Sequence, residues 1–222
     1  MLSITLLLTL VQWAFVDQVL AVTIPFGTMI TGCTVPDTIA LTFDDGPGPY
    51  TVELLEILAE FEARATFFLV GNRLNDGNNA EIVELIHSSG HQIASHTQDH
   101  PHLPLLDAEE IRQEMFAFEE SMEPITGQVP TYMRPPYLGT SADVVDVMNE
   151  LGYHVVGADI DTKDYENDSP EMIWDSFKMF VAGLDAGGSI VLAHDIKEQT
   201  VVSLTRQMLV AIQERGLQDV AA

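Results

Sequence analysis

The chain has 222 residues, of which 46% are hydrophobic, and this is enough to build one α/β domain around an apolar core. Its net charge of −25, from 34 acidic and 9 basic residues, argues against nucleic acids and anionic membranes as partners, because both would repel it. A neutral polymer, or a product that carries amines, is compatible with this charge, and the acids also keep an exported protein soluble. We expect the chain to act as a monomer.

Residues 1–21 form an apolar stretch that ends in Val19-Leu20-Ala21, a pattern typical of signal-peptide cleavage. We therefore predict a signal peptide over 1–21, a mature domain over 22–222, and a secreted protein that is extracellular or attached to the cell wall. An ordinary core strand or helix is the alternative, because the stretch lacks a positively charged start. A membrane span is disfavoured, since Gln12 and Asp17 interrupt the apolar run.

Strand and helix patterns alternate through the rest of the chain. Apolar runs bounded by turn residues predict six strands, at 39–43, 65–71, 91–95, 130–134, 153–159 and 189–195. This alternation is typical of parallel strands joined by crossover helices. Residues 217–222, after the last helix, have the pattern of a further strand that is cut short.

The predicted helices have recognisable starts and ends. One begins at Asp107 with Glu110 three residues later, which is a capping box. A second begins at Ser141 and ends at Gly152. A third is expected to start at Ser169-Pro170, because proline is favoured at the first helical position, and helical spacing places its Trp174 in the core.

Polar residues gather just past the strand ends. Asp44 and Asp45 follow the first strand, and the later strands end at the groups His96, Arg134, Asp159/Asp161 and His194/Asp195. Because the carboxyl-terminal rim of a barrel is where chemistry is built, this distribution favours a closed or nearly closed barrel over an open sheet. No glycine-rich nucleotide motif follows the first strand.

One pair of histidines predicts a metal site at this rim. His96 and His100 are four residues apart in a tight turn. Together with one carboxylate of Asp44 or Asp45 they give a three-ligand site with open positions, and the other carboxylate stays free to accept a proton. The residues alone do not decide which aspartate is the ligand.

Arg134 and His194 complete a set that can hydrolyse an amide. Arg134 can hold the free carboxylate with paired hydrogen bonds. A divalent cation lowers the pKa of water and polarises a carbonyl. An amide nitrogen must be protonated as it departs, and His194 can supply that proton. A surface arginine and a simple polar strand end are the alternatives for these two residues.

Five ordered motifs over residues 36–215 identify a family resemblance: TFDDGP, HTQDH, RPPY, DTKDY and IVLAHD. In this order they resemble the polysaccharide deacetylase family, also called the NodB-homology or carbohydrate esterase 4 family, and most closely its secreted fungal chitin deacetylases. The resemblance implies an α/β fold, a distorted (β/α)7-type barrel, here with a truncated last strand. It implies N-acetyl hydrolysis on chitin or chito-oligosaccharides, giving chitosan and acetate.

The resemblance also implies roles for single residues. Asp45, His96 and His100 would bind one divalent ion, Zn²⁺ by the donor set, with Co²⁺ or another divalent ion as alternatives. The implied catalytic and substrate-binding roles are Asp44 as base, Arg134 as its partner, His194 as acid, Asp164 as the partner of His194, the Tyr137 backbone N–H at the oxyanion, and Tyr165 and Leu192 at the sugar and acetyl group.

Two features depart from the family pattern. Tyr165 stands where the family often has tryptophan. Related sequences continue into a further strand, often with a cysteine that can pair with a residue like Cys33, the single cysteine here. Peptidoglycan and acetylxylan remain alternative substrates, and a non-catalytic carbohydrate-binding wall protein is the alternative to an enzyme.

Overall fold

In the computed structural model, residues 24–222 are described, so the predicted signal peptide lies outside the described residues. The strands are β1 Met29–Ile30, β2 Thr38–Asp44, β3 Thr66–Leu69, β4 Gln92–Ser95, β5 Tyr132–Met133, β6 His154–Val156, β7 Ile160–Asp161, β8 Ile190–His194 and β9 Gln218–Val220. The helices are α1 Thr51–Glu60, α2 Asn79–Ser88, α3 Ala108–Thr126, α4 Ala142–Leu151, α5 Ile173–Asp185 and α6 Thr205–Glu214.

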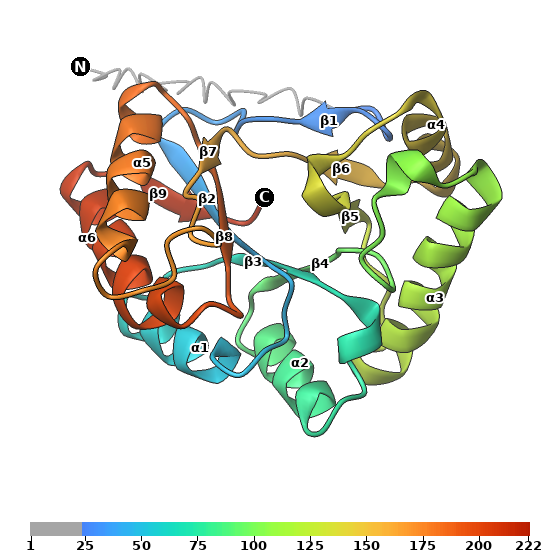
Figure 1. Ribbon diagram of the computed structural model, residues 1–222, viewed down its shortest axis with the longest axis horizontal. Helices are drawn as coiled ribbons and strands as arrows, with labels where there is room; N and C mark the ends of the chain where they lie inside the picture. Colours follow the sequence, from blue (N-terminus) through green and yellow to red (C-terminus); the bar gives the residue numbers. More distant parts are fainter. Residues whose placement is uncertain (1–23) are drawn as a thin grey trace, which may run out of the picture.

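The strands form one curled parallel sheet in the order β1-β6-β5-β4-β3-β2-β8-β7. β9 pairs in parallel with the start of β2. The helices cover the outside of this curl on three sides in Figure 1, with α5 and α6 at the left, α1 and α2 below, and α3 and α4 at the right, while β1 runs along the top. The predicted distorted barrel of parallel strands is therefore confirmed.

The curl nearly closes because of the link between β6 and β7. These strands lie near opposite ends of the strand order, yet only residues 157–159 separate them. A chain this short reaches at most roughly 14 Å from Val156 to Ile160, so the two ends of the sheet must lie close together. Residues 153–159 were predicted as one strand, and this is wrong: the chain leaves β5 at Gly157 and joins β8 instead.

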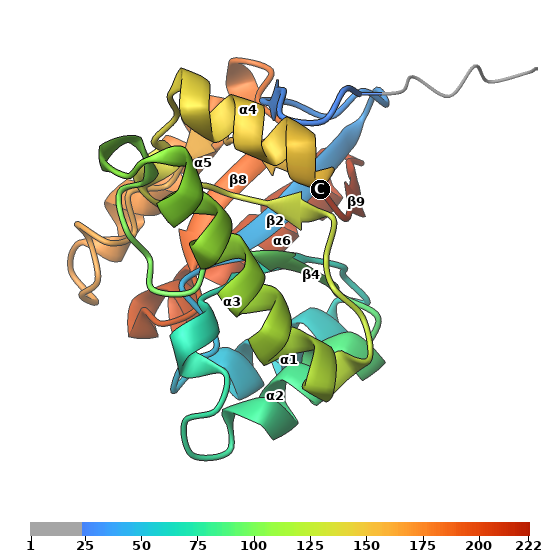
Figure 2. The same cartoon turned by 90° about the vertical axis from the view of Figure 1, so that its right-hand side faces the viewer.

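Two apolar layers fix the sheet from outside and one fills it from inside. The largest cluster joins the sheet to α1, α2, α5 and α6, and a second lies under α3 and α4. The inner cluster is Ala40, Phe68, Ala94, Val156 and Ile190, one residue from each of five strands. Figure 2 shows α3 and α4 packed side by side over one flank of the sheet.

Local signals placed most helix ends correctly. Asp107 caps α3 as predicted, with both reciprocal bonds of the capping box to Glu110, and Ser141 and Gly152 bound α4. α5 begins at Ile173 and not at Ser169-Pro170, which lie in a turn. Trp174 was expected in the core, but it is 54% exposed on α5.

No helix within residues 24–222 combines the length and the apolar character that crossing a membrane requires.

Candidate active site

The two aspartates at the end of β2 face different surroundings. β2 is buried along its whole length, and Asp44, its last residue, is 3% exposed. Asp45 follows with φ 72°, a left-handed conformation that costs a residue with a Cβ about 1–2 kcal/mol. The change of backbone direction turns the two neighbouring carboxylates into one pocket.

Arg134 holds Asp44 from behind. Its guanidinium is fully buried, and Nη1 donates to Asp44 Oδ1 at 2.7 Å and to Thr42 Oγ1 at 2.6 Å. Nη2 and Nε donate to the carbonyls of Gly157 and Val156. The predicted paired hydrogen bonds to the carboxylate are therefore wrong in form: one nitrogen contacts Asp44, and the others are used to fix the guanidinium itself.

Asp45, His96 and His100 form a group that could hold a metal ion. One donor atom from each lies within 4.8 Å of the others. His100 Nε2 lies 3.2 Å and His96 Nε2 3.7 Å from Asp45 Oδ1. Two imidazole nitrogens and one carboxylate on one side of a pocket suit a divalent transition ion with open coordination positions.

The tautomer of His96 suits metal binding through Nε2. Its Nδ1 lies 2.7 Å from the Arg134 carbonyl, which can only accept, so Nδ1 carries the proton and Nε2 presents its lone pair. Burial lowers the pKa of His96, which keeps the imidazole neutral. Burial opposes ionisation of Asp45, but its hydrogen bond with His100 lowers its pKa to about 2. The lone pair of His96 Nε2 and the Asp45 carboxylate are thus in the forms that bind a cation.

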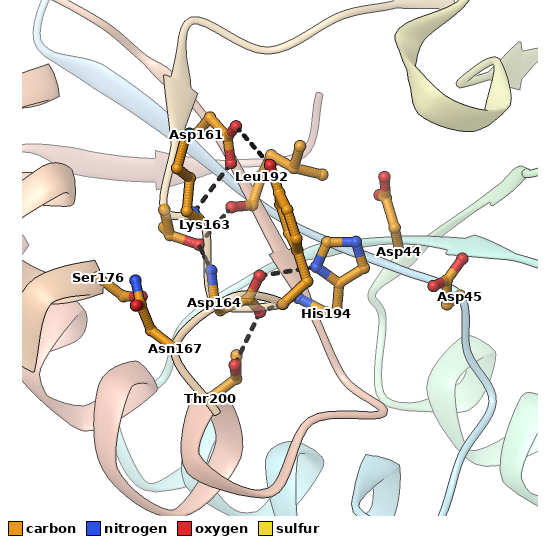
Figure 3. A network of polar contacts seen from close by, with 12 residues as sticks. Asp44, Asp45, Asp161, Lys163, Asp164, Asn167, Ser176, Leu192, His194 and Thr200 are labelled. Carbon is orange, nitrogen blue, oxygen red and sulfur yellow. Dashed lines mark hydrogen bonds and ion pairs between the residues drawn. The ribbon is translucent and has the colours of Figure 1, made fainter. Parts of the chain in front are cut away.

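His194 ends β8 beside Asp44, which is its register partner on β2, and Asp164 holds it (Figure 3). Asp164 Oδ1 lies 2.7 Å from His194 Nδ1, and Oδ2 accepts from the His194 backbone N–H and from Thr200 Oγ1. A carboxylate accepts, so Nδ1–H donates and Nε2 faces Asp44 and Asp45. Burial opposes protonation, but Asp164 and then Asp44 raise the pKa of His194 to about 9.

These groups share one pocket of about 430 Å³, lined by Asp44, Asp45, His96, His100, Tyr137, Leu138, Asp161, Tyr165, Leu192 and His194. Every predicted site residue lines it except Arg134 and Asp164, which are fully buried behind Asp44 and His194. Tyr137 and Tyr165 are 69% and 43% exposed, so their rings form its open lip.

Sequence reasoning did not assign Asp161 to the site. Asp161 lines the pocket, accepts from the Lys163 backbone N–H at 2.9 Å, and lies 3.2 Å from the Tyr165 hydroxyl, which donates to it. Its place just past a strand end was visible in the sequence, but its contact with Tyr165 depends on the turn between them.

Asp195, next to His194, was placed at the rim by the sequence but was given no role. It is fully buried, its Oδ2 accepts from Thr51 Oγ1 at 2.5 Å, and Oδ1 has no hydrogen-bond partner within the described residues. Thr51 Oγ1 in turn accepts from the Gly48 N–H at 2.8 Å. Burial raises the pKa of Asp195 to about 7. This chain of bonds ties the segment after Asp45 to the segment that carries His194.

The sequence motif Asn-Asp-Ser, which has the pattern of a glycosylation site, lies in the folded interior at Asn167. Asn167 is 7% exposed, and its Nδ2 donates to Ser176 Oγ at 3.1 Å. The two side chains lie next to each other in Figure 3.

Comparisons with known proteins agree with this geometry. A family model described as polysaccharide deacetylase matches residues 31–156. A chitin deacetylase of Pestalotiopsis sp is 46% identical over 195 residues, which are 87% of this chain and 65% of the relative. A probable peptidoglycan-N-acetylglucosamine deacetylase of Arthroderma benhamiae is 46% identical over 201 residues, 89% of this chain and 46% of that protein. The chain thus spans about half to two thirds of the length of these curated relatives.

Among solved structures, the chitin deacetylase of the fungal pathogen Colletotrichum lindemuthianum superposes with a TM-score of 0.87 at 40% identity. The match covers 89% of this chain and 91% of that one.

Proposed function

The chain belongs to the polysaccharide deacetylase family, and from this premise we propose that it hydrolyses the N-acetyl groups of N-acetylglucosamine units in chitin. The products are acetate and a polymer with free amines. One observation carries the proposal: three donors for a divalent cation line the same pocket as an imidazole whose second nitrogen is fixed by a buried carboxylate.

Asp45, His96 and His100 would hold the ion. When bound there, a divalent cation supplies charge that polarises the acetyl carbonyl and lowers the pKa of water, and Zn²⁺ suits the donor set, with Co²⁺ as the alternative.

Asp44 acts as general base in this proposal. Its Oδ1 accepts from Arg134 Nη1, while its Oδ2 lies 3.8 Å from His96 Nε2. The carboxylate therefore binds Arg134 with one oxygen and borders the cation site with the other. The attacking water gives its proton to Asp44 as its oxygen bonds to the acetyl carbon. Arg134, fixed by two backbone carbonyls, orients the Asp44 carboxylate through a hydrogen bond from Nη1.

His194 acts as general acid. An amide nitrogen is too poor a leaving group as an anion, so it must receive a proton while the carbon–nitrogen bond breaks. Asp164 fixes the tautomer of His194 and raises its pKa to about 9, although burial opposes this. Nε2 therefore carries a proton at neutral pH and faces the reacting group. The Tyr137 backbone N–H would bind the oxyanion, and Tyr165 and Leu192 would contact the sugar and the acetyl methyl.

The test is acetate release from N-acetylglucosamine oligomers by the purified chain, before and after metal removal with a chelator. Release that stops without metal and returns when Zn²⁺ is added is the expected result. Equal acetate release with and without chelator would contradict the proposal. Binding of the oligomers without turnover would favour the alternative of a non-catalytic wall protein.

A second candidate substrate has a specific observation in its favour. One relative at 46% identity is described as a probable peptidoglycan-N-acetylglucosamine deacetylase. Both polymers present the same acetylated amine, so the groups that perform the reaction do not distinguish them. Rates measured side by side on chitin oligomers, peptidoglycan fragments and acetylxylan distinguish the candidate substrates. A faster rate on peptidoglycan than on chitin would make peptidoglycan the assigned substrate.

We also propose that the chain is exported and acts outside the cell as a monomer. The support is the apolar composition of residues 1–21 and the small residue at Ala21. Protein recovered from the culture medium should begin at Val22 and elute as a single chain in light-scattering measurements. Protein retained inside the cell with residues 1–21 intact would contradict export.

A further inference from the structure

The loop between His96 and His100 carries both imidazoles and has an unusual backbone. Thr97 has φ 69° and His100 has φ 57°, left-handed values that residues with a Cβ rarely adopt. Such conformations cost about 1–3 kcal/mol each and persist only where surrounding contacts impose them. Something outside the loop must therefore hold it.

Two contacts on one side of the loop come from the segment after β3. The carbonyls of Thr97 and Gln98 accept from the backbone N–H groups of Gly71 and Asn72 at 3.0 and 2.8 Å. These bonds use only carbonyl groups of the loop, and Thr97 and His100 donate their amides to hydroxyls within residues 95–100, so the amides of Gln98 and Asp99 need acceptors from elsewhere.

Glu114 on α3 supplies them. Its Oε2 accepts from the backbone N–H groups of Gln98 and Asp99 at 3.0 and 2.9 Å. Both bonds end on one carboxylate oxygen, so a single side chain holds two consecutive amides of the turn. Its neighbour Met115 and, one turn further, Phe118 are fully buried, which fixes α3 against the sheet and makes Glu114 a rigid anchor.

The two histidines depend on this anchor to different degrees. His96 is held through its own ring by the Arg134 carbonyl, and its side chain is 3% exposed. The His100 side chain is 24% exposed, and the hydrogen bond that places it is a backbone one, from its N–H to Thr97 Oγ1 at 3.1 Å. The position of His100 Nε2 opposite Asp45 therefore follows from the shape of the loop.

We infer that Glu114 is a positioning residue that fixes the His96–His100 loop so that both imidazoles point at one cation; this rests on the proposed function. Glu114 does not line the pocket and acts through the loop, by way of the amides of Gln98 and Asp99. Partners that hydrogen-bond to a metal ligand typically change metal affinity by about 10- to 100-fold when they are lost. Glu114 bonds to the loop between two ligands, so we expect an effect near the lower end of that range.

The experiment measures Zn²⁺ binding to the metal-free full chain by calorimetry. Glu114→Ala should raise the Kd about tenfold or more. Glu114→Asp keeps the charge but withdraws the carboxylate by about 1.5 Å, one carbon–carbon bond, and should weaken binding similarly. Glu114→Gln keeps an oxygen that can accept both amides and should restore affinity to within about threefold.

Glu120→Ala is the matched control. Glu120 is exposed on the same helix, so this change alters helix propensity and net charge equally but leaves the loop alone. Its Kd for Zn²⁺ should equal that of the parent. A parent-like Kd in both Glu114→Ala and Glu114→Asp, or equal weakening in Glu120→Ala, would overturn the inference.

A second readout needs no metal. Hydrogen exchange of the Gln98 and Asp99 amides should speed up in Glu114→Ala and Glu114→Asp but not in Glu120→Ala. Unchanged exchange in the first two would also overturn the inference. If the parent chain binds no Zn²⁺, the proposed function fails, and the exchange measurement still decides whether Glu114 holds the loop. Should Glu114→Ala not fold, the Asp and Gln variants carry both measurements.

Discussion

The base and the lip of the pocket are built in opposite ways. At the base, the side chains of Asp44 and His96 are 4% and 3% exposed, and Arg134 is fully enclosed behind them. At the lip, Tyr137 and Tyr165 are 69% and 43% exposed.

The difference teaches where a substitution acts. Polar groups at the enclosed base have fixed partners and no access to bulk water, so a change there alters chemistry and folding stability together. At the open lip, water replaces a lost contact, so a change should alter substrate affinity alone. Four substitutions test this contrast.

Asp44→Asn should have the largest effect, a loss of about a thousandfold in kcat, because an amide cannot take a proton from water. The amide oxygen can still accept from Arg134 Nη1, so Zn²⁺ affinity should stay near that of the parent. Turnover of N-acetylglucosamine oligomers and calorimetric Zn²⁺ titration check both points. Asp146→Asn, at an exposed position on α4, is the control and should be fully active. A kcat above a tenth of the parent value would remove Asp44 from its role.

Asp164→Asn should lower kcat about a hundredfold and shift the pH profile. Asp164 raises the pKa of His194 to about 9 against the effect of burial. Without that carboxylate the pKa falls, the imidazole loses its proton at lower pH, and the alkaline limb of kcat/KM should move to lower pH. Rates measured from pH 6 to 10 test the direction. An alkaline limb that stays in place would show that another group is the acid.

Thr42→Val should act mainly on stability. Thr42 Oγ1 accepts from Arg134 Nη1 and donates to the Val191 carbonyl at 2.5 Å, all in a fully buried position. Loss of the hydroxyl leaves buried partners unsatisfied and should lower the free energy of unfolding by about 1–3 kcal/mol. Urea denaturation measures this. Thr38→Val, at the more accessible start of β2, should cost less, and an equal cost would contradict the contrast between enclosed and open positions.

Tyr165→Phe should have the smallest effect. The exposed hydroxyl donates to Asp161 at 3.2 Å, and its loss should raise KM by no more than about fivefold with kcat unchanged, since such a bond contributes about 1 kcal/mol or less. Steady-state kinetics on chitin oligomers separate KM from kcat. Tyr50→Phe, outside the pocket lining, is the control. A large fall in kcat would place the phenol in the chemistry and not at the lip.

Much of the fold and of the pocket could be predicted from the sequence. The acids, the histidines and the arginine stand at the carboxyl ends of predicted strands, and parallel strands bring those ends to one edge of the sheet. The residue pairs Asp107/Glu110 and Ser141/Gly152 marked helix ends correctly, because capping depends on neighbours within one turn.

Other features needed contacts between distant segments. The break between β6 and β7 follows from pairing with β5 on one side and β8 on the other, which the apolar run 153–159 does not encode locally. Arg134 donates hydrogen bonds to the carbonyls of Val156 and Gly157. The Glu114 carboxylate accepts from two amides that lie 16 and 15 residues before it in the chain. Exposure of Trp174 likewise depends on which face of α5 the sheet covers.

The sequence by itself therefore determined the alternation of strands and helices, the helix caps, and the residue types that meet at the rim, since each of these depends on short spacing or on strand order. Only the tertiary structure decided how those residues are held: which oxygen of Asp44 is paired, which nitrogen of each histidine is free, and which helix supports the His96–His100 loop. The physical reason is that hydrogen bonds are short and directional, and their partners are chosen by packing between segments far apart in the chain.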